Sequence, residues 1–210
     1  MKDLFSINGS FWGILNRFVD LVILNFLFII CCVPIVTIGA SKTALYDVAK
    51  RLSKNEEGYI FRSFLKSFKN NFKASTIMWL IYVTSMVIIG VDLYICTIID
   101  MDTIVVASTA VIVLLAILIN MTFIYSIVLQ STFENTLKNT VTNGFIISVT
   151  RLPFTVLILL VEMIPVGLIF FLTYYWPYII TFLVVIGFSV LAYVNSFIFN
   201  RVLENFKYCK

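Results

Sequence analysis

Long apolar runs alternate with short polar stretches along this chain. A helix that crosses a bilayer needs roughly 20 mostly apolar residues, and five runs come close to or exceed that length. They lie at about 18–38, 74–99, 103–129, 154–174 and 178–199. The third run is the clearest, because Ile104 to Ile119 contains no charged residue. The pattern predicts an all-α fold, a polytopic bundle of about five transmembrane helices in a lipid bilayer.

The polar connection at residues 40–73 has a helical period of its own. Leu45, Val48, Ala49 and Leu52 recur at the i, i+3, i+4, i+7 spacing of an amphipathic helix. After a turn at residues 55–58, a second amphipathic helix is predicted, with phenylalanines on one face and mostly basic residues on the other. The candidate contact residues of this second helix are Phe61, Arg62, Phe64, Lys66, Phe68, Lys69, Phe72 and Lys73.

Three interpretations of this second helix are open. Phenylalanines beside cations are typical of a helix that lies on the inner leaflet, with its cations at anionic headgroups. The same combination fits a docking surface for a partner protein. In the third interpretation the helix lies at the membrane surface and only fixes the topology of the chain.

The positions of Lys and Arg predict the orientation. With five spans, one side of the membrane collects 13 basic residues and the other collects 2. Basic residues are enriched on the cytoplasmic side. We therefore expect residues 40–73 and the C-terminus in the cytoplasm, and the N-terminus outside, in a multi-pass protein of the cell membrane.

Composition leaves little room for anything but a membrane domain. The 210 residues are 61% hydrophobic and 12% charged, which predicts one integral membrane domain over residues 1–210 and no soluble domain of ordinary size. The net charge of +4 reflects the basic connections, so it is not interpreted as a sign of nucleic-acid binding.

Several classes of chemistry lack their residues. The chain has no His, which removes His-ligated metal sites and His-dependent catalytic triads. Its cysteines, Cys31, Cys32, Cys96 and Cys209, lack the spacing of metal ligands, and no phosphate-binding loop is present. We expect a non-enzymatic protein without catalytic residues, metal or cofactor.

Glu162 is the one ionisable residue well inside a predicted span. A carboxylate in the membrane costs about 3 kcal/mol on insertion scales unless it is neutral or paired. The predicted topology places Asn120 and Asn195 in the same half of the membrane, where their amides can bond to Glu162. This cluster has two interpretations, a proton- or substrate-binding site and a polar contact that joins helices.

The first half of the chain carries recognisable motifs. They are Asp20 to Leu27, Cys32 to Ala40, Ala44 to Tyr46, Glu57 to Ile60, Phe64, and Ser67 to Lys73. In these motifs the chain resembles the YesL family of small bacterial integral membrane proteins of undefined function. The most specific part is Pro34-x-x-Thr37-x-Gly39-Ala40. Physically, Pro34, Thr37 and Gly39 suit a helix break at the interface, where Thr37 is expected to cap the following helix and form a structural corner.

The resemblance implies an association with carbohydrate uptake and assigns no ligand-binding residue. The leading hypothesis is a non-enzymatic accessory or regulatory membrane component, with the permease of a carbohydrate ABC transporter as its expected partner. A homo-oligomer is an open alternative for its assembly. The alternative function is a small secondary transporter or channel, with Glu162, Asn120 and Asn195 along its path.

Overall fold

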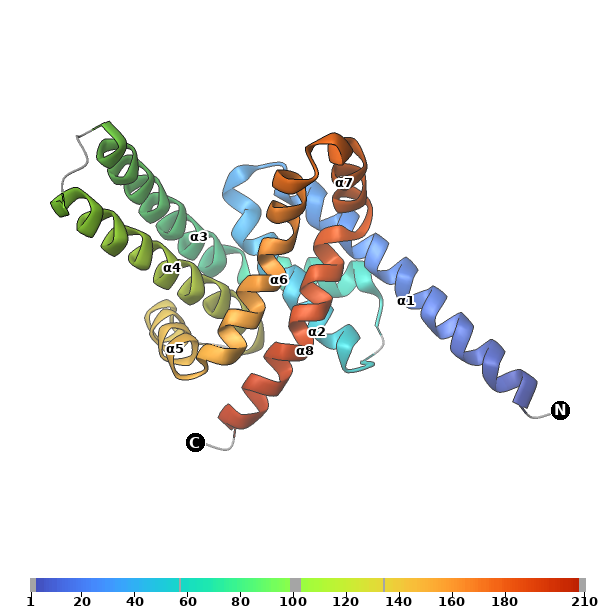
Figure 1. Cartoon of the computed structure of the whole chain (residues 1–210). Helices are drawn as coiled ribbons and strands as arrows, with labels where there is room; N and C mark the ends of the chain where they lie inside the picture. The colour runs from blue at the N-terminus through green and yellow to red at the C-terminus, as the bar shows by residue number, and fades with distance from the viewer. Residues whose placement is uncertain (1–2, 57, 99–102, 134, 208–210) are drawn as a thin grey trace.

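The computed structural model describes residues 3–56, 58–98, 103–133 and 135–207. Its elements are all helical, which confirms the predicted all-α fold. Figure 1 shows them in chain order. The helices are α1 (Asp3–Cys32), α2 (Ile38–Ser53), α3 (Ile60–Ile98), α4 (Thr103–Thr132), α5 (Leu137–Thr150), α6 (Leu152–Phe171), α7 (Trp176–Phe182) and α8 (Phe188–Lys207). Shorter turns are η1 (Ile35–Thr37), η2 (Thr173–Tyr175) and the π-helical η3 (Leu183–Gly187).

Within the described residues, five segments are long and apolar enough to cross a membrane. They are Gly13–Cys32, Ile60–Ile98, Ile104–Thr132, Leu152–Phe171 and Trp176–Leu203. The number matches the prediction, and the chain is a multi-pass membrane protein by this measure.

Two predicted boundaries are wrong. The first span was expected to continue to Ile38, but α1 ends at Cys32 because Pro34 takes an extended conformation and supplies no backbone N–H. The second span was expected to begin at residue 74 after a separate amphipathic helix. The two form one continuous helix, α3, because no proline or glycine interrupts residues 60–89.

The polar helix α2 occupies the centre of the molecule (Figure 1). Twelve of its 16 residues are buried, and it packs against α1, α3, α4 and α8. Helix α2 is therefore covered by protein on several faces, and not only along the predicted apolar stripe. Small residues permit the burial: a Cβ on Gly39 would meet the Ser75 carbonyl and lie 2.5 Å from the Trp79 Cβ. Helices approach this closely only where such small side chains face each other.

Hydrogen bonds fix α2 antiparallel to both α1 and α3. Near the end of α2, Arg17 of α1 donates to the Leu52 carbonyl and to Asn55 Oδ1, the latter at 2.6 Å. At its start, Thr43 Oγ1 donates to Ser75 Oγ at 2.8 Å. The chain therefore returns along α1 after Pro34 and turns again at residues 54–59 to enter α3.

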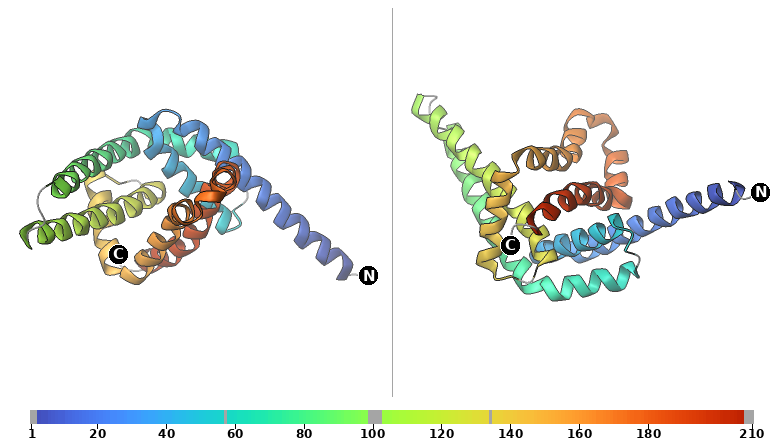
Figure 2. Two further views of the ribbon diagram at one scale, coloured as in Figure 1. Left: turned by 45° about the horizontal axis from the view of Figure 1, so that its top comes forward. Right: turned by 90° about the horizontal axis from the view of Figure 1, so that it is seen from below.

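The far parts of α3 and α4 form a hairpin that projects from this core (Figures 1 and 2). It comprises residues 80–98 and 103–120, named here the outer hairpin. None of residues 80–98 and 104–120 is buried, and apolar side chains cover its surface, for example Ile88 and Leu114, both 57% exposed. Because these helices satisfy their own backbone hydrogen bonds, such a surface suits contact with lipid.

Asn25 of α1 joins the first span to the last. Its side chain is fully buried and donates to the Leu183 and Val184 carbonyls at 3.1 and 2.6 Å, while Ser189 N–H donates to Asn25 Oδ1 at 3.0 Å. A π-helical turn disturbs the regular backbone hydrogen bonding of a helix. In η3, the Asn25 side chain donates hydrogen bonds to two of the backbone carbonyls.

Candidate functional site

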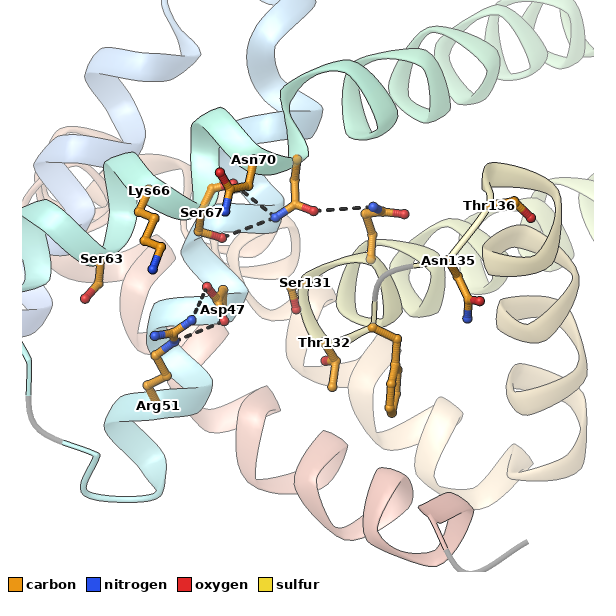
Figure 3. Close-up of a pocket in the computed structure, with 13 residues that line it drawn as sticks. Asp47, Arg51, Ser63, Lys66, Ser67, Asn70, Ser131, Thr132, Asn135 and Thr136 are labelled. Atoms are coloured by element: carbon orange, nitrogen blue, oxygen red, sulfur yellow. Dashed lines mark hydrogen bonds and ion pairs between the residues drawn. The ribbon is translucent and has the colours of Figure 1, made fainter. Parts of the chain in front are cut away.

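A polar cleft opens where α2, the first half of α3 and the end of α4 meet (Figure 3). Its volume is about 990 Å³. Nine of the 13 residues that line it are Ser, Thr, Asn or Gln, so hydrogen-bonding groups dominate its walls. The lining residues are Asp47, Arg51, Ser63, Lys66, Ser67, Asn70, Asn71, Gln130, Ser131, Thr132, Phe133, Asn135 and Thr136.

The helical period of α3 explains which of its side chains reach the cleft. Its first half buries Ile60, Phe64 and Ser67 against the core. At 100° per residue, Ser63 and Asn70 lie on one flank of that buried stripe and line the cleft. The basic residues lie on the side of the helix away from the core, and all are exposed. This basic stripe consists of Arg62, Lys66, Lys69 and Lys73.

An ion pair positions one of the two cations of the cleft. Arg51 Nε and Nη2 donate to the two carboxylate oxygens of Asp47 at 3.2 and 3.1 Å. The Asp47 side chain is only 8% exposed, whereas that of Arg51 is 49% exposed. A guanidinium has five N–H groups, so after the two bonds to Asp47 three have no partner among the described residues and can bind water or a ligand.

Lys66 is the other cation that lines the cleft. It has no ion-pair or hydrogen-bond partner among the described residues. Figure 3 shows Lys66 from α3 and Arg51 from α2 extending toward the same region beside Asp47. Among the described lining residues, two cations and one carboxylate give this end of the cleft a positive balance.

A chain of amides holds the walls of the cleft together. Gln130 Nε2 donates to Asn71 Oδ1 at 3.3 Å, and Thr140 Oγ1 donates to Gln130 Oε1 at 3.3 Å. Lys50 of α2 donates to Thr132 Oγ1 at the end of α4. These bonds link α2, α3, α4 and α5, so the cleft has a fixed frame.

Glu162 lies at a second polar cluster, between α2, α6 and α8. Lys42 Nζ is 3.3 Å from Glu162 Oε2, and the Tyr46 hydroxyl donates to Glu162 Oε1 at 2.6 Å. Asn195 Nδ2 donates to the Tyr46 oxygen at 3.5 Å. Glu162 and Asn195 are thus connected through Tyr46. Asn120 is half-buried and makes no side-chain hydrogen bond within the part of the chain described.

Tyr46 stays protonated in this cluster. Burial and then the charge of Glu162 raise the pKa of its hydroxyl well above the ordinary value of 10. A neutral Tyr46 donates to Glu162, and Lys42 supplies the opposite charge. Glu162 thus has two polar partners, as an acidic side chain among spans requires.

Sequence reasoning did not find Lys42 and Tyr46 as partners of Glu162. A signal was present, because the two residues are four apart and therefore share one face of a helix. The spacing was not used, because residues 40–73 were expected to form a cytoplasmic connection remote from the fourth span.

The residues of the predicted contact face of α3 differ in their exposure. Phe61, Arg62, Lys66, Lys69, Phe72 and Lys73 are exposed. Phe64, however, is fully buried, and Phe68 is half-buried against the core. Phe64 is therefore not available for contact with the leaflet or a partner, and Phe68 offers only part of its surface, because α2 covers that side of the helix.

The residues of the predicted corner lie between the end of α1 and the first turn of α2. Thr37 occupies the N-cap position of α2 but makes no capping bond. Its hydroxyl donates instead to the carbonyls of Cys31 and Pro34, at 2.6 and 2.7 Å. The capping prediction is therefore wrong, and Thr37 satisfies carbonyls at the end of α1. Gly39 provides the close approach to α3.

Residues 21–93 match the model of a family described as "Protein of unknown function, DUF624". The chain is similar to a family of unknown function. The match includes the whole of α2 and most of α3, the two helices that form one side of the cleft. No curated protein and no solved structure matches the chain.

Proposed function

We propose that this protein is a non-enzymatic accessory or regulatory membrane component that contacts an anionic partner through the first half of α3. The observation that carries the proposal is the basic stripe, Arg62, Lys66, Lys69 and Lys73, on the side of α3 opposite its buried face. The helix is held on that buried side by α2, so the stripe is presented on a rigid support.

Exposed rings adjoin the basic stripe. Phe61 and Phe72 are 56% and 41% exposed, and Arg62 lies 5.6 Å from the centre of the Tyr59 ring. Aromatic rings and arginine are enriched at protein interfaces, and complementary charge accelerates encounter with an anionic surface. The combination supports docking of a partner at the cytoplasmic face predicted from the charge distribution.

The carbohydrate part of the proposal comes from the resemblance to the YesL family. It names the permease of a carbohydrate ABC transporter as the expected partner. In this proposal the protein itself transports nothing and adjusts the assembly or activity of the permease.

Photo-crosslinking from single positions tests the docking surface. A photoreactive phenylalanine analogue replaces Phe61 or Phe72 in the full chain, in native membranes at endogenous expression. The matched control replaces Tyr94, an aromatic residue 67% exposed on the outer hairpin. We expect the α3 positions, and not Tyr94, to capture a membrane protein that mass spectrometry identifies as a permease. Capture of lipid alone, or of a second copy alone, from all three positions contradicts the proposal.

Transport is a second candidate function, favoured by one feature of the Glu162 cluster. Asn195 is fully buried, and its Oδ1 has no hydrogen-bond partner. The side chains of Lys42 and Glu162 are about a quarter exposed, at 24% and 27%. A buried acceptor without a partner beside a partly accessible ion pair is compatible with a site for a proton or a small substrate.

The transport candidate is tested in liposomes with purified protein. Glu162→Gln is expected to abolish flux or its pH dependence, and Tyr46→Phe serves as a control that keeps the carboxylate but removes one of its bonds. Both variants are first compared with wild type by gel filtration and circular dichroism. Wild-type flux and pH dependence in Glu162→Gln would exclude Glu162 from a transport path.

A further inference from the structure

We infer that the polar cleft binds a phosphate ester of a polyol, such as a sugar phosphate or a glycerol phosphate group. The inference does not rest on the proposed docking function. The two share Lys66, but the cleft is defined by its lining residues, whereas docking uses the exposed surface around Phe61 and Phe72. Three observations carry it: the free guanidinium donors of Arg51, the nearby Lys66 ammonium, and the neutral polar walls.

The charge of the cleft selects an anion. Asp47 uses two N–H groups of Arg51 and so orients the guanidinium without occupying its remaining three. Arginine donors in a fixed plane match the oxygens of phosphate, and lysine adds a mobile point charge. Lys69 and Lys73 lie outside the lining on the same helix, so they raise the local potential without entering the cleft.

The rest of the cleft selects hydroxyl groups. Ser63, Asn70 and Asn135 line it and make no side-chain hydrogen bond within the described part of the chain. Amides and hydroxyls both donate and accept, as the hydroxyls of a polyol do. An apolar ligand would leave these groups without water or a partner, at a free-energy penalty for each.

The size and the frame of the cleft fit this ligand class. Ligand pockets have volumes of about 300–1,000 Å³, and this cleft has about 990 Å³. The bonds from Asn71 to Gln130 and from Lys50 to Thr132 fix its walls to one another. Because the walls are already connected, binding requires little further ordering of the protein.

Binding to the full-length protein in nanodiscs of phosphatidylcholine tests the inference. The probe is glucose 6-phosphate, compared with glucose and with inorganic phosphate by calorimetric titration. We expect the ester to bind at least tenfold more tightly than glucose and several-fold more tightly than inorganic phosphate. Equal binding of glucose and its phosphate, or no binding of the ester, would overturn the inference.

Two lysines one turn apart supply matched variants. Lys66→Gln removes the cation without a described partner and should weaken binding of the ester about tenfold or more. Lys69→Gln removes a cation outside the lining and should change binding less than twofold. Equal weakening by the two variants would assign the binding to the general positive surface and overturn the inference. Both residues are exposed, so neither substitution is expected to disturb folding.

A third variant tests recognition of the polyol. Asn70→Ala should weaken binding of glucose 6-phosphate about threefold and leave binding of inorganic phosphate unchanged. An equal effect on both probes would contradict recognition of the polyol hydroxyls.

Nanodiscs that contain phosphatidylglycerol distinguish the two sources of the ligand. If the natural ligand is this headgroup, which carries a phosphate and glycerol hydroxyls, the lipid will compete and abolish binding of glucose 6-phosphate. If the natural ligand is a soluble ester, the affinity for glucose 6-phosphate will be the same in nanodiscs with and without phosphatidylglycerol at physiological salt. Binding in these discs that is lost equally in Lys66→Gln and Lys69→Gln would again overturn the inference.

Discussion

The central helix α2 and the outer hairpin show opposite relations between polarity and burial. Helix α2 contains Lys42, Asp47, Lys50 and Arg51, yet most of it is buried by protein. The outer hairpin is far more apolar and has no buried residue in 80–98 or 104–120. In a soluble protein these two positions would be exchanged.

The difference teaches that hydropathy and burial measure separate quantities in this protein. Hydropathy reports which helices suit lipid, because lipid tails are as apolar as the side chains they meet. Burial reports which helices contact other helices, and here small residues, hydroxyls and paired charges make that contact. We therefore expect the polar region to specify the fold and the outer hairpin to tolerate substitution.

The largest expected contrast is between two glycines. Gly39→Ala should destabilise the protein by about 3 kcal/mol, because the new Cβ meets a backbone carbonyl on α3 that cannot move independently. Gly90→Ala in the outer hairpin should be neutral or stabilise by up to about 1 kcal/mol, since nothing lies within 4 Å and alanine favours helix. The free energy of unfolding in mixed micelles measures both. Equal destabilisation would remove the proposed contrast between the two regions.

The next contrast concerns polar side chains inside spans. Asn25→Ala should cost about 2 kcal/mol, because the Ser189 N–H and the carbonyls of η3 lose their buried partner. Ser85→Ala removes a hydroxyl that bonds only to the Ile81 carbonyl of its own helix, and should change stability by less than about 0.5 kcal/mol. The same unfolding assay applies, and a neutral Asn25→Ala would show that η3 does not depend on α1.

A smaller contrast compares two tyrosine hydroxyls. Tyr46→Phe removes the bond to Glu162 and leaves Asn195 without its partner, so we expect a loss of about 1–2 kcal/mol. Tyr94→Phe, on the exposed surface of the outer hairpin, should change stability by less than about 0.5 kcal/mol. Equal changes in the free energy of unfolding would mean that the Tyr46 hydroxyl stabilises the protein no more than the exposed Tyr94 hydroxyl does.

The smallest effect is a pH dependence that belongs to Tyr46. Its pKa is raised in the folded protein, so its stabilising contribution is complete below the unfolded pKa of about 10 and is lost as pH rises above that value. The stability difference between wild type and Tyr46→Phe should be constant from pH 6 to 9 and shrink above pH 10. A difference that falls already between pH 6 and 8 would point to another titrating group.

Sequence alone predicted the class of fold, the five spans and the basic stripe, because each depends on local periodicity. It did not predict the burial of α2. The sequence of α2 shows one apolar stripe, which predicts that one face of the helix is buried. The other faces are also covered, and only contacts with other helices, such as that of Thr43 with Ser75, show this. Those partners are distant in sequence, so no local pattern reveals them.

The candidate sites also contain residues that the sequence identified and residues that it did not. Glu162 stood out because a carboxylate in a span is costly. The structure connects Asn195 to it only through Tyr46, and Asn120 has no side-chain bond within the described part of the chain. Tyr46 and Lys42 were not found because residues 40–73 were expected to form a cytoplasmic connection away from the fourth span. The cleft was not found either, since α2, α3 and α4 contribute to it from three separate parts of the chain.

Thiol labelling of single cysteines in native membranes tests the burial of α2 most directly. The background replaces the four native cysteines with serine. Cysteines at Ala44 and Val48, on α2, are compared with cysteines at Arg62 and Lys69, on the exposed side of α3. The structure predicts rapid labelling of both α3 positions by a charged maleimide, and no labelling of the α2 positions until the protein is denatured. Labelling of Ala44→Cys or Val48→Cys in the folded protein at the rate of Lys69→Cys would contradict a buried central helix.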